Sequence, residues 1–349
     1  MKPKTIKTGI MSYGMSGQLF HAPFIDYHEM FELTAILERS RNLSAERYPD
    51  ATIVRSTDEL LAINELELII VNTPDLTHYE YTRQALLAGK HVVVEKPFAQ
   101  TVAQCRELIR IAEERNLMLC VYQNRRWDGD FLTVKNIIEQ GTLGRLVEFE
   151  STFARYRNYI KPDTWKEQSG GMMYNLGSHI VDQTISLFGL PEAVYVDIAT
   201  MRDGGVVDDY FCLHLIRCAK NPELRVTLKA GYLMCEPEPR FVLHGTEGSY
   251  LKHGVDPQEE RLKNGETPLA DNWGLESPDK WGVITTEQEG RVKYPTVKGD
   301  YTSFYDAVYQ SLRNGAEHPT DARGNVAVIQ LLETVSKAKP GSVVDMNPK

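Results

Sequence analysis

The sequence predicts a two-domain α/β protein, with a parallel sheet in the first domain and a largely antiparallel open sheet in an α+β second domain. Three observations predict this fold class. The 349 residues exceed one typical core. Short apolar runs alternate with helical patterns up to residue 123, and longer alternating runs, mostly without helices between them, begin near residue 145. We place the domain boundary between residues 123 and 124.

The first domain, residues 1–123, is expected to contain βαβ units. Two of its strands are nearly continuous apolar runs, as in strands that helices cover on both faces. Gly89 follows one helical pattern in the position of a C-terminal cap. The expected strands are 5–11, 33–38, 52–54, 68–72, 91–94 and 118–122, and the expected helices are 43–48, 58–63, 77–88 and 102–115.

The second domain, residues 124–349, is expected to bind the substrate and to support oligomerisation. A helix over 175–188 should cover one face of its sheet, and the other face should pack on another subunit in a homodimer or homotetramer. The polar stretch 252–282 is expected to be a long loop. The expected strands are 146–156, 193–201, 209–217, 224–231 and 240–243; helices over 301–313 and 321–336 close the chain, the last one able to pack back on the first domain.

Composition and charge narrow the function classes. Hydrophobic residues make up 42% and charged residues 25%, which is ordinary for a globular protein. The net charge of −9 comes without a basic stripe, so we expect neither nucleic acid nor a membrane as a partner. The five cysteines are scattered and form no metal-binding cluster with histidine. We therefore expect no metal, and reduced packing cysteines in a cytoplasmic protein.

A glycine-rich turn follows the first expected strand. Gly14 would let the backbone approach a pyrophosphate, and Gly17 would let the next helix pack on the strand. Free N–H groups at the start of that helix suit phosphates. Ser12 replaces the first glycine of the dinucleotide fingerprint, whose S-x-G-x-x-G variant here is Ser12-Tyr13-Gly14-Met15-Ser16-Gly17. The sequence therefore predicts a Rossmann dinucleotide-binding domain.

The residues at the end of the second expected strand bear on the choice of cofactor. Glu38 lies 21 positions after Gly17, close to the roughly 20 expected for a carboxylate that binds the ribose hydroxyls of NAD. Arg39, Ser40 and Arg41 follow it and could equally hold the 2′-phosphate of NADP. The sequence leaves NAD and NADP open.

Further motifs extend along nearly the whole chain and carry a resemblance. They are Phe20-His21-Ala22-Pro23, Asn72-Thr73-Pro74 with His78, Glu95-Lys96-Pro97, the stretches 123–128 and 155–157, and Gly170-Gly171 before Asn175, His179 and Asp182. Together with the glycine turn they resemble the Gfo/Idh/MocA oxidoreductases, and within them the subgroup that contains NADP-linked scyllo-inositol dehydrogenases. The expected cofactor-binding residues are Ser12, Tyr13, Gly14, Met15, Ser16, Gly17, Glu38, Arg39, Ser40, Asn72, Thr73, Pro74, His78, Glu95, Lys96 and Asn124.

The expected catalytic residues are Lys96, His179 and Asn175. Lys96 follows a strand at the sheet edge where α/β folds bind ligands, and its amine could stabilise a developing alkoxide. The resemblance implies a cis peptide bond before Pro97. In a helix, Asn175, His179 and Asp182 would share one face, and His179 suits proton transfer. Family members commonly carry aspartate at position 175, and an amide cannot take a proton.

The resemblance implies an oxidoreductase that transfers hydride between a nicotinamide and a secondary hydroxyl or ketone of a sugar or inositol-like polyol. Arg126, Tyr156, Trp165 and Asp182 are the expected substrate-binding residues. Two alternatives stay open. One is a nicotinamide-binding sensor that has lost catalysis, which Asn175 favours, and the other is a reductase of the same fold that acts on a non-sugar substrate.

Overall fold

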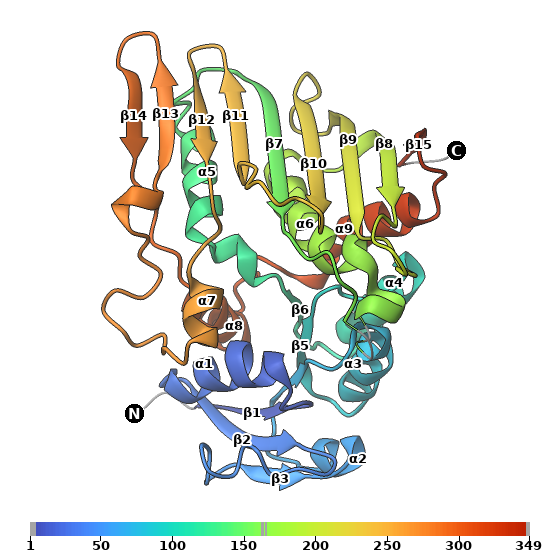
Figure 1. The fold of residues 1–349 in the computed structure, drawn as a ribbon. Coiled ribbons are helices and arrows are strands. Elements are labelled where there is room, and N and C mark those ends of the chain that lie inside the picture. The colour runs from blue at the N-terminus through green and yellow to red at the C-terminus, as the bar shows by residue number, and fades with distance from the viewer. Residues whose placement is uncertain (1–4, 162–163, 165, 347–349) are drawn as a thin grey trace. The chain divides into compact units, whose positions relative to one another are not determined.

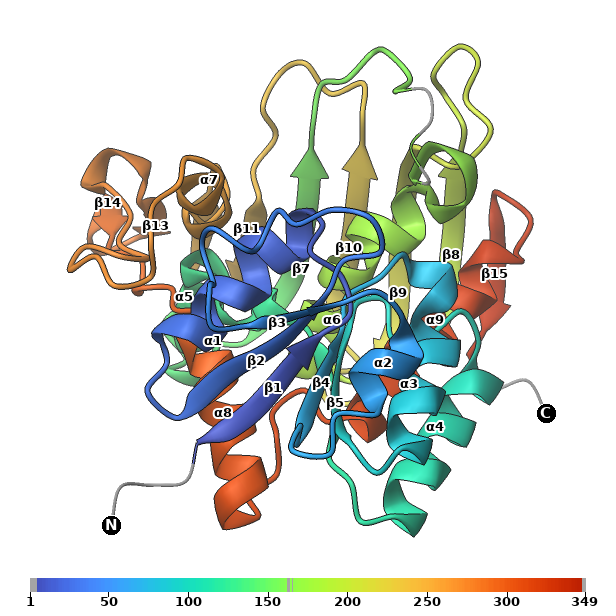
Figure 2. The same ribbon diagram turned by 90° about the horizontal axis from the view of Figure 1, so that it is seen from below.

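The computed structural model of the chain is described over residues 5–161, 164 and 166–346 (Figures 1 and 2). It folds into two compact units. Unit 1 comprises Met1–Asn124, Gln258–Trp273 and Asp300–Ile329. Unit 2 comprises Arg125–Pro257, Gly274–Gly299 and Gln330–Lys349.

Unit 1 is built on a six-stranded parallel sheet, as the sequence predicted. Its strand order, β3-β2-β1-β4-β5-β6, runs outward in both directions from β1 and β4. Doubly wound sheets of this order bind ligands at the carboxyl ends of the strands, beside the point where the order reverses. The strands are β1 (Ile6–Ile10), β2 (Phe31–Leu37), β3 (Thr52–Val54), β4 (Leu68–Val71), β5 (His91–Glu95) and β6 (Leu119–Tyr122).

Local chemistry explains where the helices of unit 1 begin. The hydroxyls of Ser56 and Thr101 accept hydrogen bonds from the backbone N–H groups of Glu59 and Gln104, so both residues are N-caps. Gly89, with φ +77°, follows α3 as expected. The helical segments are η1 (Gly17–His21, a π-helical turn), α1 (Ala22–Tyr27), α2 (Thr57–Leu61), η2 (Asp75–Thr77), α3 (His78–Leu87), α4 (Val102–Glu114), α7 (Gln258–Lys263) and α8 (Thr302–Asn314).

Two predictions for segments of unit 1 were wrong. Residues 43–47 form turns in place of the helix expected over 43–48, because the Glu38 carboxylate binds the first N–H groups of the segment. The stretch 252–282 was expected to be a loop but contains α7. Gln258 explains its order, since this buried side chain accepts hydrogen bonds from the Trp273 indole and the Tyr301 backbone.

Unit 2 is built on a nine-stranded sheet that is antiparallel except for the parallel pair β7–β10. The prediction of a largely antiparallel open sheet is therefore confirmed. The strand order is β14-β13-β12-β11-β7-β10-β9-β8-β15. The strands are β7 (Leu146–Ala154), β8 (Pro191–Ala199), β9 (Tyr210–Cys218), β10 (Arg225–Gly231), β11 (Phe241–Gly245), β12 (Gly248–Lys252), β13 (Gly282–Thr286), β14 (Gly290–Tyr294) and β15 (Ser342–Asp345).

Helix α6 (Ser178–Phe188) covers one face of this sheet, as Figure 1 shows. The Phe188 ring packs edge-on against Phe149 of β7, with 5.0 Å between ring centroids. The buried Arg240 guanidinium links α6 to the sheet, because it donates to Gln183 of α6 and lies over the Phe153 ring of β7. The other helical segments are α5 (Gly129–Glu139), η4 (Lys166–Gly170), η5 (Met173–Gly177) and η6 (Pro278–Lys280), while η3 (Asn124–Trp127) and α9 (Ala322–Ser336) run from unit 1 into unit 2.

Three observations concern the expectations about membranes, metals and cysteines. Across the described ranges, no helix is long and apolar enough to cross a bilayer, and no three His, Cys, Asp or Glu side chains are grouped so that they could hold a metal ion. The five cysteines, all of them among the described residues, are thiols and not disulfide-bonded. Cys105, Cys120 and Cys218 are buried, but Cys235 is exposed, so its interpretation as a packing residue was wrong.

Candidate functional site

The glycine turn in unit 1 is shaped by close backbone approaches. A Cβ atom on Gly17 would lie 2.2 Å from the Ser12 carbonyl oxygen, so only glycine fits there. The Ser12 hydroxyl accepts a hydrogen bond from the Gly14 N–H at 3.3 Å. Asn72 Nδ2 reaches from the end of β4 and donates to the Ser12 carbonyl at 2.7 Å. Ser12 thus supports the turn with its own side chain in the position of the missing glycine.

A cavity of about 480 Å³ opens beside this turn, at the carboxyl ends of β1, β2 and β4. A Cβ atom on Gly14 would meet only the Ser12 hydroxyl, at an ordinary 3.4 Å, so nothing in the protein itself requires glycine there. The missing side chain instead leaves room for a ligand, which fits a dinucleotide pyrophosphate. The cavity is lined by Met11, Ser12, Tyr13, Gly14, Gln18, Leu37, Glu38, Arg39, Ser40, Arg41, Leu43, Thr73, Pro74, Thr77 and Tyr81.

The Glu38 carboxylate holds the turn that follows it. One oxygen accepts from the Leu43 N–H and the other from the Ser44 N–H and hydroxyl, at 2.6–2.9 Å. Burial acts to raise the pKa of Glu38, but these hydrogen bonds and the Arg55 charge outweigh it, and the pKa lies below its usual value. Glu38 is therefore an ionised anchor whose two oxygens are both engaged within the protein.

The three residues after Glu38 present their side chains to solvent along the cavity. Arg39, Ser40 and Arg41 are exposed and line it. Arg55 fixes their backbone, since its guanidinium donates to the carbonyl oxygens of Glu38 and Arg41 at 2.7 and 2.6 Å. Two cations and a hydroxyl on a fixed loop form a site suited to a phosphate group.

Within the Asn72-Thr73-Pro74 segment, Thr73 and Pro74 line the cavity. His78, which was expected to bind the cofactor, is 1% exposed. Its ring nitrogens lie 2.7 Å from the Pro97 carbonyl and 2.9 Å from the Thr73 carbonyl. His78 therefore ties the loop after β4 to the loop after β5.

The remaining residues expected to bind the cofactor in unit 1 differ in exposure. Tyr13 is nearly buried and packs edge-on against Tyr48, whereas Met15 is 56% exposed. The Ser16 hydroxyl accepts a 3.3 Å hydrogen bond from Asn72 Nδ2. Asn124 is 6% exposed, just beyond β6.

Lys96 stands directly after β5 and is half-buried. The Lys96–Pro97 peptide bond is cis, which confirms what the resemblance implied. The Lys96 N–H donates to the Glu95 carboxylate at 3.1 Å. An ammonium group at the carboxyl edge of this sheet can donate to a substrate oxygen and stabilise negative charge on it.

In unit 2, Gly170 and Gly171 precede the segment that carries Asn175 and His179. Gly171 has φ +55°, and a Cβ atom on it would lie 2.1 Å from the Asp208 carboxylate. That carboxylate accepts from the Met173 N–H at 2.6 Å, and the Asp208 carbonyl accepts from the Met172 N–H at 2.8 Å. Burial raises the pKa of Asp208 above its usual value. Because Gly171 has no side chain, the Asp208 carboxylate can approach the backbone closely enough to accept from the Met173 N–H.

The segment that carries Asn175 is π-helical. Met173–Gly177 forms η5, and regular α-helix begins only at Ser178. Asn175 is half-buried and His179 is 6% exposed in the first turn of α6. The α-helix expected over 175–188 therefore begins three residues later than predicted, and Asn175 lies in the π-helical turn before it. Only His179 and Asp182 lie three residues apart on α6 itself.

Asp182 forms an ion pair with Arg126. Its two oxygens accept from the guanidinium of Arg126 at 2.7 Å each, in a bidentate pair in which Asp182 is 1% exposed. Tyr156 is 57% exposed just after β7. Trp165 lies outside the described residues. Asp182 therefore orients Arg126, and its carboxylate is held by the protein.

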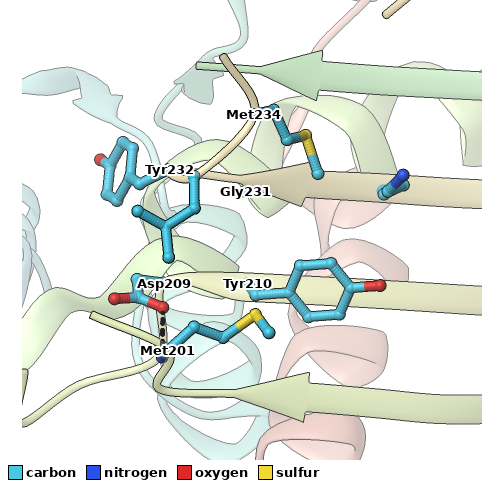
Figure 3. A pocket seen from close by; sticks show the side chains of 8 residues that line it. Met201, Asp209, Tyr210, Gly231, Tyr232 and Met234 are labelled. Carbon is cyan, nitrogen blue, oxygen red and sulfur yellow. Dashed lines mark hydrogen bonds between the residues drawn. The ribbon is translucent and has the colours of Figure 1, made fainter. Parts of the chain in front are cut away.

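A second cavity, of about 250 Å³, lies within unit 2 at the ends of β9 and β10 (Figure 3). Its acidic lining residue, Asp209, accepts from the Met201 N–H at 2.7 Å, the contact drawn as a dashed line. None of the predicted substrate residues that the structure describes lines it. It is lined by Met201, Asp209, Tyr210, Lys229, Gly231, Tyr232, Leu233 and Met234.

A buried ion cluster beside this cavity was not predicted. The Arg202 guanidinium donates to Glu167 of η4 at 2.7 Å and to Asp209 at 2.8 Å, and it also donates to the Tyr159 carbonyl. The side chains of Arg202, Glu167 and Asp209 are at most 8% exposed. Asp209 lies seven residues after Arg202, but Glu167 lies 35 residues before it, so no local spacing could have joined Glu167 to the cluster. The same holds for Arg55 in unit 1, whose partners Glu38 and Arg41 lie 17 and 14 residues away.

Comparisons with known proteins show which family the chain belongs to. Residues 6–123 match the family model described as "Oxidoreductase family, NAD-binding Rossmann fold", and residues 135–346 match "Oxidoreductase family, C-terminal alpha/beta domain". The chain is 37% identical over 343 residues to scyllo-inositol 2-dehydrogenase (NADP(+)) IolW of Bacillus subtilis, covering 97% of this chain and 94% of that protein. It is 40% identical to the uncharacterized oxidoreductase YdgJ of Escherichia coli, covering 94% of each.

A solved structure gives the same result for the fold. The crystal structure of an oxidoreductase from Bacteroides fragilis NCTC 9343 is 53% identical, with a TM-score of 0.91 and coverage of 98% of this chain and 100% of that one. The two family models together span both units. The chain therefore belongs to the Gfo/Idh/MocA family of oxidoreductases, with NAD or NADP as its cofactor.

Proposed function

We propose that the protein transfers hydride between the nicotinamide of NADP and a secondary hydroxyl carbon, or the corresponding ketone, of a sugar or inositol-like cyclic polyol. The observation that carries the proposal is the cavity at the carboxyl edge of the parallel sheet, with Lys96 at the end of β5 in that same sheet. The names of two relatives support the substrate class: scyllo-inositol 2-dehydrogenase, and D-glucoside 3-dehydrogenase at 28% identity over 214 residues.

The proposed preference for NADP rests on the loop after β2. A carboxylate selects NAD by accepting from the ribose hydroxyls. Here both oxygens of Glu38 are engaged by the Leu43 and Ser44 segment, while Arg39 and Arg41 line the cavity with exposed cations. A 2′-phosphate would supply the anion that these cations lack.

In the proposed reaction, Lys96, His179 and Asn175 have different roles. The cofactor, when bound, supplies the hydride acceptor or donor. Lys96 donates a hydrogen bond to the substrate oxygen and stabilises it as an alkoxide. His179 takes the hydroxyl proton during oxidation and returns it during reduction. Asn175 orients the hydroxyl through its amide, and it leaves the proton to His179 because an amide is no base.

The tasks of holding the ligands fall to other residues. The turn 12–17, the segment 72–74, Glu95 and Asn124 bind the cofactor, and His78 positions the loops that do so. Arg126, oriented by Asp182, binds substrate hydroxyls, together with Tyr156 and Trp165. In this proposal, residues 1–123 bind the cofactor, and residues 124–349 bind the substrate and support oligomerisation.

Assembly and location are part of the proposal. The face of the sheet opposite α6 carries half-exposed side chains, among them Tyr195, Cys212 and Lys229, with the exposed His214 between them. We place the contact of a homodimer or homotetramer on this face, in the cytoplasm. Light scattering after size-exclusion chromatography measures the molar mass and tests this assembly. We expect the Lys229→Glu variant, which reverses the charge on this face, to be monomeric.

The central test is an assay of nicotinamide absorbance with purified protein, NAD or NADP, and a panel of inositols, aldoses and sugar acids. We expect turnover with at least one polyol, with kcat/KM about tenfold or more higher for NADP. Lys96→Ala and His179→Ala should each lower kcat by about 100-fold or more. Cofactor binding without turnover across the panel would favour a sensor, and turnover only of non-sugar carbonyls would favour a different reductase.

A pair of variants tests the proposed phosphate site. Arg41→Gln should lower the NADP preference about tenfold, because a cation–phosphate contact is lost. Arg47→Gln is the matched control, since Arg47 belongs to the same exposed stretch but does not line the cavity. An unchanged NADP/NAD ratio in Arg41→Gln and in Arg39→Gln would contradict the NADP assignment.

A further inference from the structure

A buried chain of three polar side chains ends at Glu95, the residue before Lys96. The Tyr305 hydroxyl of α8 lies 2.7 Å from His21 Nδ1, and His21 Nε2 lies 3.1 Å from a carboxylate oxygen of Glu95. His21 and Tyr305 are fully buried, and the Glu95 side chain is 13% exposed. All three belong to unit 1. A buried polar chain that spans three elements is costly unless each member is satisfied.

The hydrogen-bond directions in this chain follow from the chemistry of its members. An ionised carboxylate only accepts, so His21 Nε2 carries the proton and donates to Glu95. The second carboxylate oxygen accepts from the Lys96 backbone N–H at 3.1 Å. Glu95 is therefore fixed from both sides, by His21 on one oxygen and by the backbone of Lys96 on the other.

Five charged or titratable groups among the described residues interact electrostatically with Glu95. They are His21 of η1, Lys96, His78 of α3, Tyr122 of β6 and Tyr305 of α8. Burial acts to raise the pKa of Glu95, but the hydrogen bond from His21 and the attraction of His21, Lys96 and His78 outweigh it, so its pKa lies below the usual value. The carboxylate is thus ionised at neutral pH.

We propose that His21 is a positioning residue that holds the ionised Glu95 carboxylate beside Lys96 and thereby keeps Lys96 in its ammonium form. The inference rests on the proposed function, in which Lys96 stabilises the substrate oxygen. Coulomb attraction is mutual, so the attraction of Lys96 for the Glu95 charge also favours the proton on Lys96. An ammonium group stabilises an alkoxide, whereas a neutral amine does so far less.

The first test measures the protonation of Lys96 without turnover. The rate at which acetic anhydride labels Lys96 is followed by mass spectrometry against pH, because only the neutral amine reacts. Glu95→Gln removes the charge but keeps the size and an oxygen that can accept from His21. We expect its labelling midpoint to fall by about one pH unit or more, since an adjacent opposite charge shifts a pKa by that much.

The second test asks whether His21 acts through Glu95. His21→Leu should lower the midpoint in the same direction by a smaller amount, and His21→Gln, which keeps an N–H donor, should restore it. The double variant His21→Leu/Glu95→Gln should match Glu95→Gln alone, because both changes act through one carboxylate. His318→Leu is the control: His318 is a buried histidine of unit 1 whose bonds go to Phe304 and Thr320, and this change should leave the midpoint where it is.

Kinetics then separate this inference from the proposed function. With an active substrate, the alkaline limb of the kcat profile should move to lower pH in Glu95→Gln by the same amount as the labelling midpoint. An unmoved midpoint in Glu95→Gln, or an additive double variant, would overturn the inference even if Lys96→Ala is inactive. A moved midpoint combined with an active Lys96→Ala would instead refute the catalytic role of Lys96.

Discussion

The two units hold their site segments with contacts of different reach along the chain. In unit 1, Ser12 bonds the backbone two residues ahead, and Glu38 bonds residues five and six ahead. In unit 2, Asp208 holds Met173 and Arg202 holds Glu167, each across 35 residues. The turns of the cofactor side therefore combine such local bonds with a long-range contact, from Asn72 to Ser12, whereas the segment before α6 is held by residues 35 positions away.

This difference has a consequence for substitutions. A change in the turns of unit 1 should alter ligand binding while most of the fold persists, because each turn depends on few partners. A change in the cluster around Arg202 should affect the stability of unit 2 first.

The largest expected effect is that of Arg202→Met. Two carboxylates that are at most 8% exposed, Glu167 and Asp209, would lose the guanidinium that neutralises them. Removing one partner of a buried ion cluster typically costs about 3–5 kcal/mol, because uncompensated charge stays buried. Denaturant unfolding followed by tryptophan fluorescence measures this loss.

A double variant serves as the control for Arg202. Arg202→Met with Glu167→Gln removes one of the stranded charges and should recover part of the lost free energy of unfolding. If Arg202→Met unfolds at the wild-type denaturant concentration, the cluster does not hold the segment, and the contrast between the units fails.

A smaller loss is expected from Gly171→Ala. The left-handed backbone costs a residue other than glycine about 1–2 kcal/mol, and the new Cβ atom would also collide with the Asp208 carboxylate. Gly204→Ala is the matched control in unit 2, since Gly204 has φ +75° but nothing within 4 Å of a Cβ atom. Gly171→Ala should therefore lose more free energy of unfolding than Gly204→Ala, and equal losses would mean that Asp208 moves aside freely.

Much of unit 1 could be predicted because its signals are local. The buried runs of β4 and β5 are continuous in sequence, and Gly89 marks the end of α3. The glycine turn was identified despite Ser12, since strand, turn and helix follow one another. The helix expected over 43–48 failed because its apolar spacing competes with the Glu38 carboxylate, which ties down the N–H groups of Leu43 and Ser44.

The site segment of unit 2 was less predictable. The spacing of Asn175, His179 and Asp182 fits an α-helix, but the segment up to Gly177 is π-helical. Asp208 and Arg202, which anchor it, lie in a polar stretch with no periodic signal. Strand β14 was missed because most of its side chains are exposed, which leaves no apolar alternation.

Within unit 1, Gly17→Ala and Gly14→Ala should separate fold from binding. Gly17 has no room for a Cβ atom because of the Ser12 carbonyl, so its replacement should cost about 1–3 kcal/mol of stability. Gly14→Ala should unfold like the wild type but raise the Kd for NADP about tenfold, as its methyl group enters the proposed pyrophosphate site. Calorimetric titration and thermal unfolding measure the two effects, and equal stability losses would contradict this division.

The smallest effect expected is that of Glu38→Gln, and it depends on pH. The folded pKa of Glu38 is lowered, so its carboxylate adds stability above the unfolded pKa of about 4.3, and this contribution is lost as the pH falls through the folded pKa. At pH 7 the variant should be less stable by about 1 kcal/mol, since Gln keeps one accepting oxygen but not the charge. Below the folded pKa, protonated Glu38 is as neutral as Gln, and the difference should disappear.

The control for Glu38 is Glu46→Gln, an exposed carboxylate of the same stretch, which should change the free energy of unfolding by less than about 0.5 kcal/mol at any pH. If Glu38 instead served the cofactor and not the turn, Glu38→Gln would leave the stability of the free protein unchanged and alter only the NADP/NAD ratio. A pH-dependent loss of stability without cofactor would show that even the cofactor loop, the most local part of the site, depends on one buried charge.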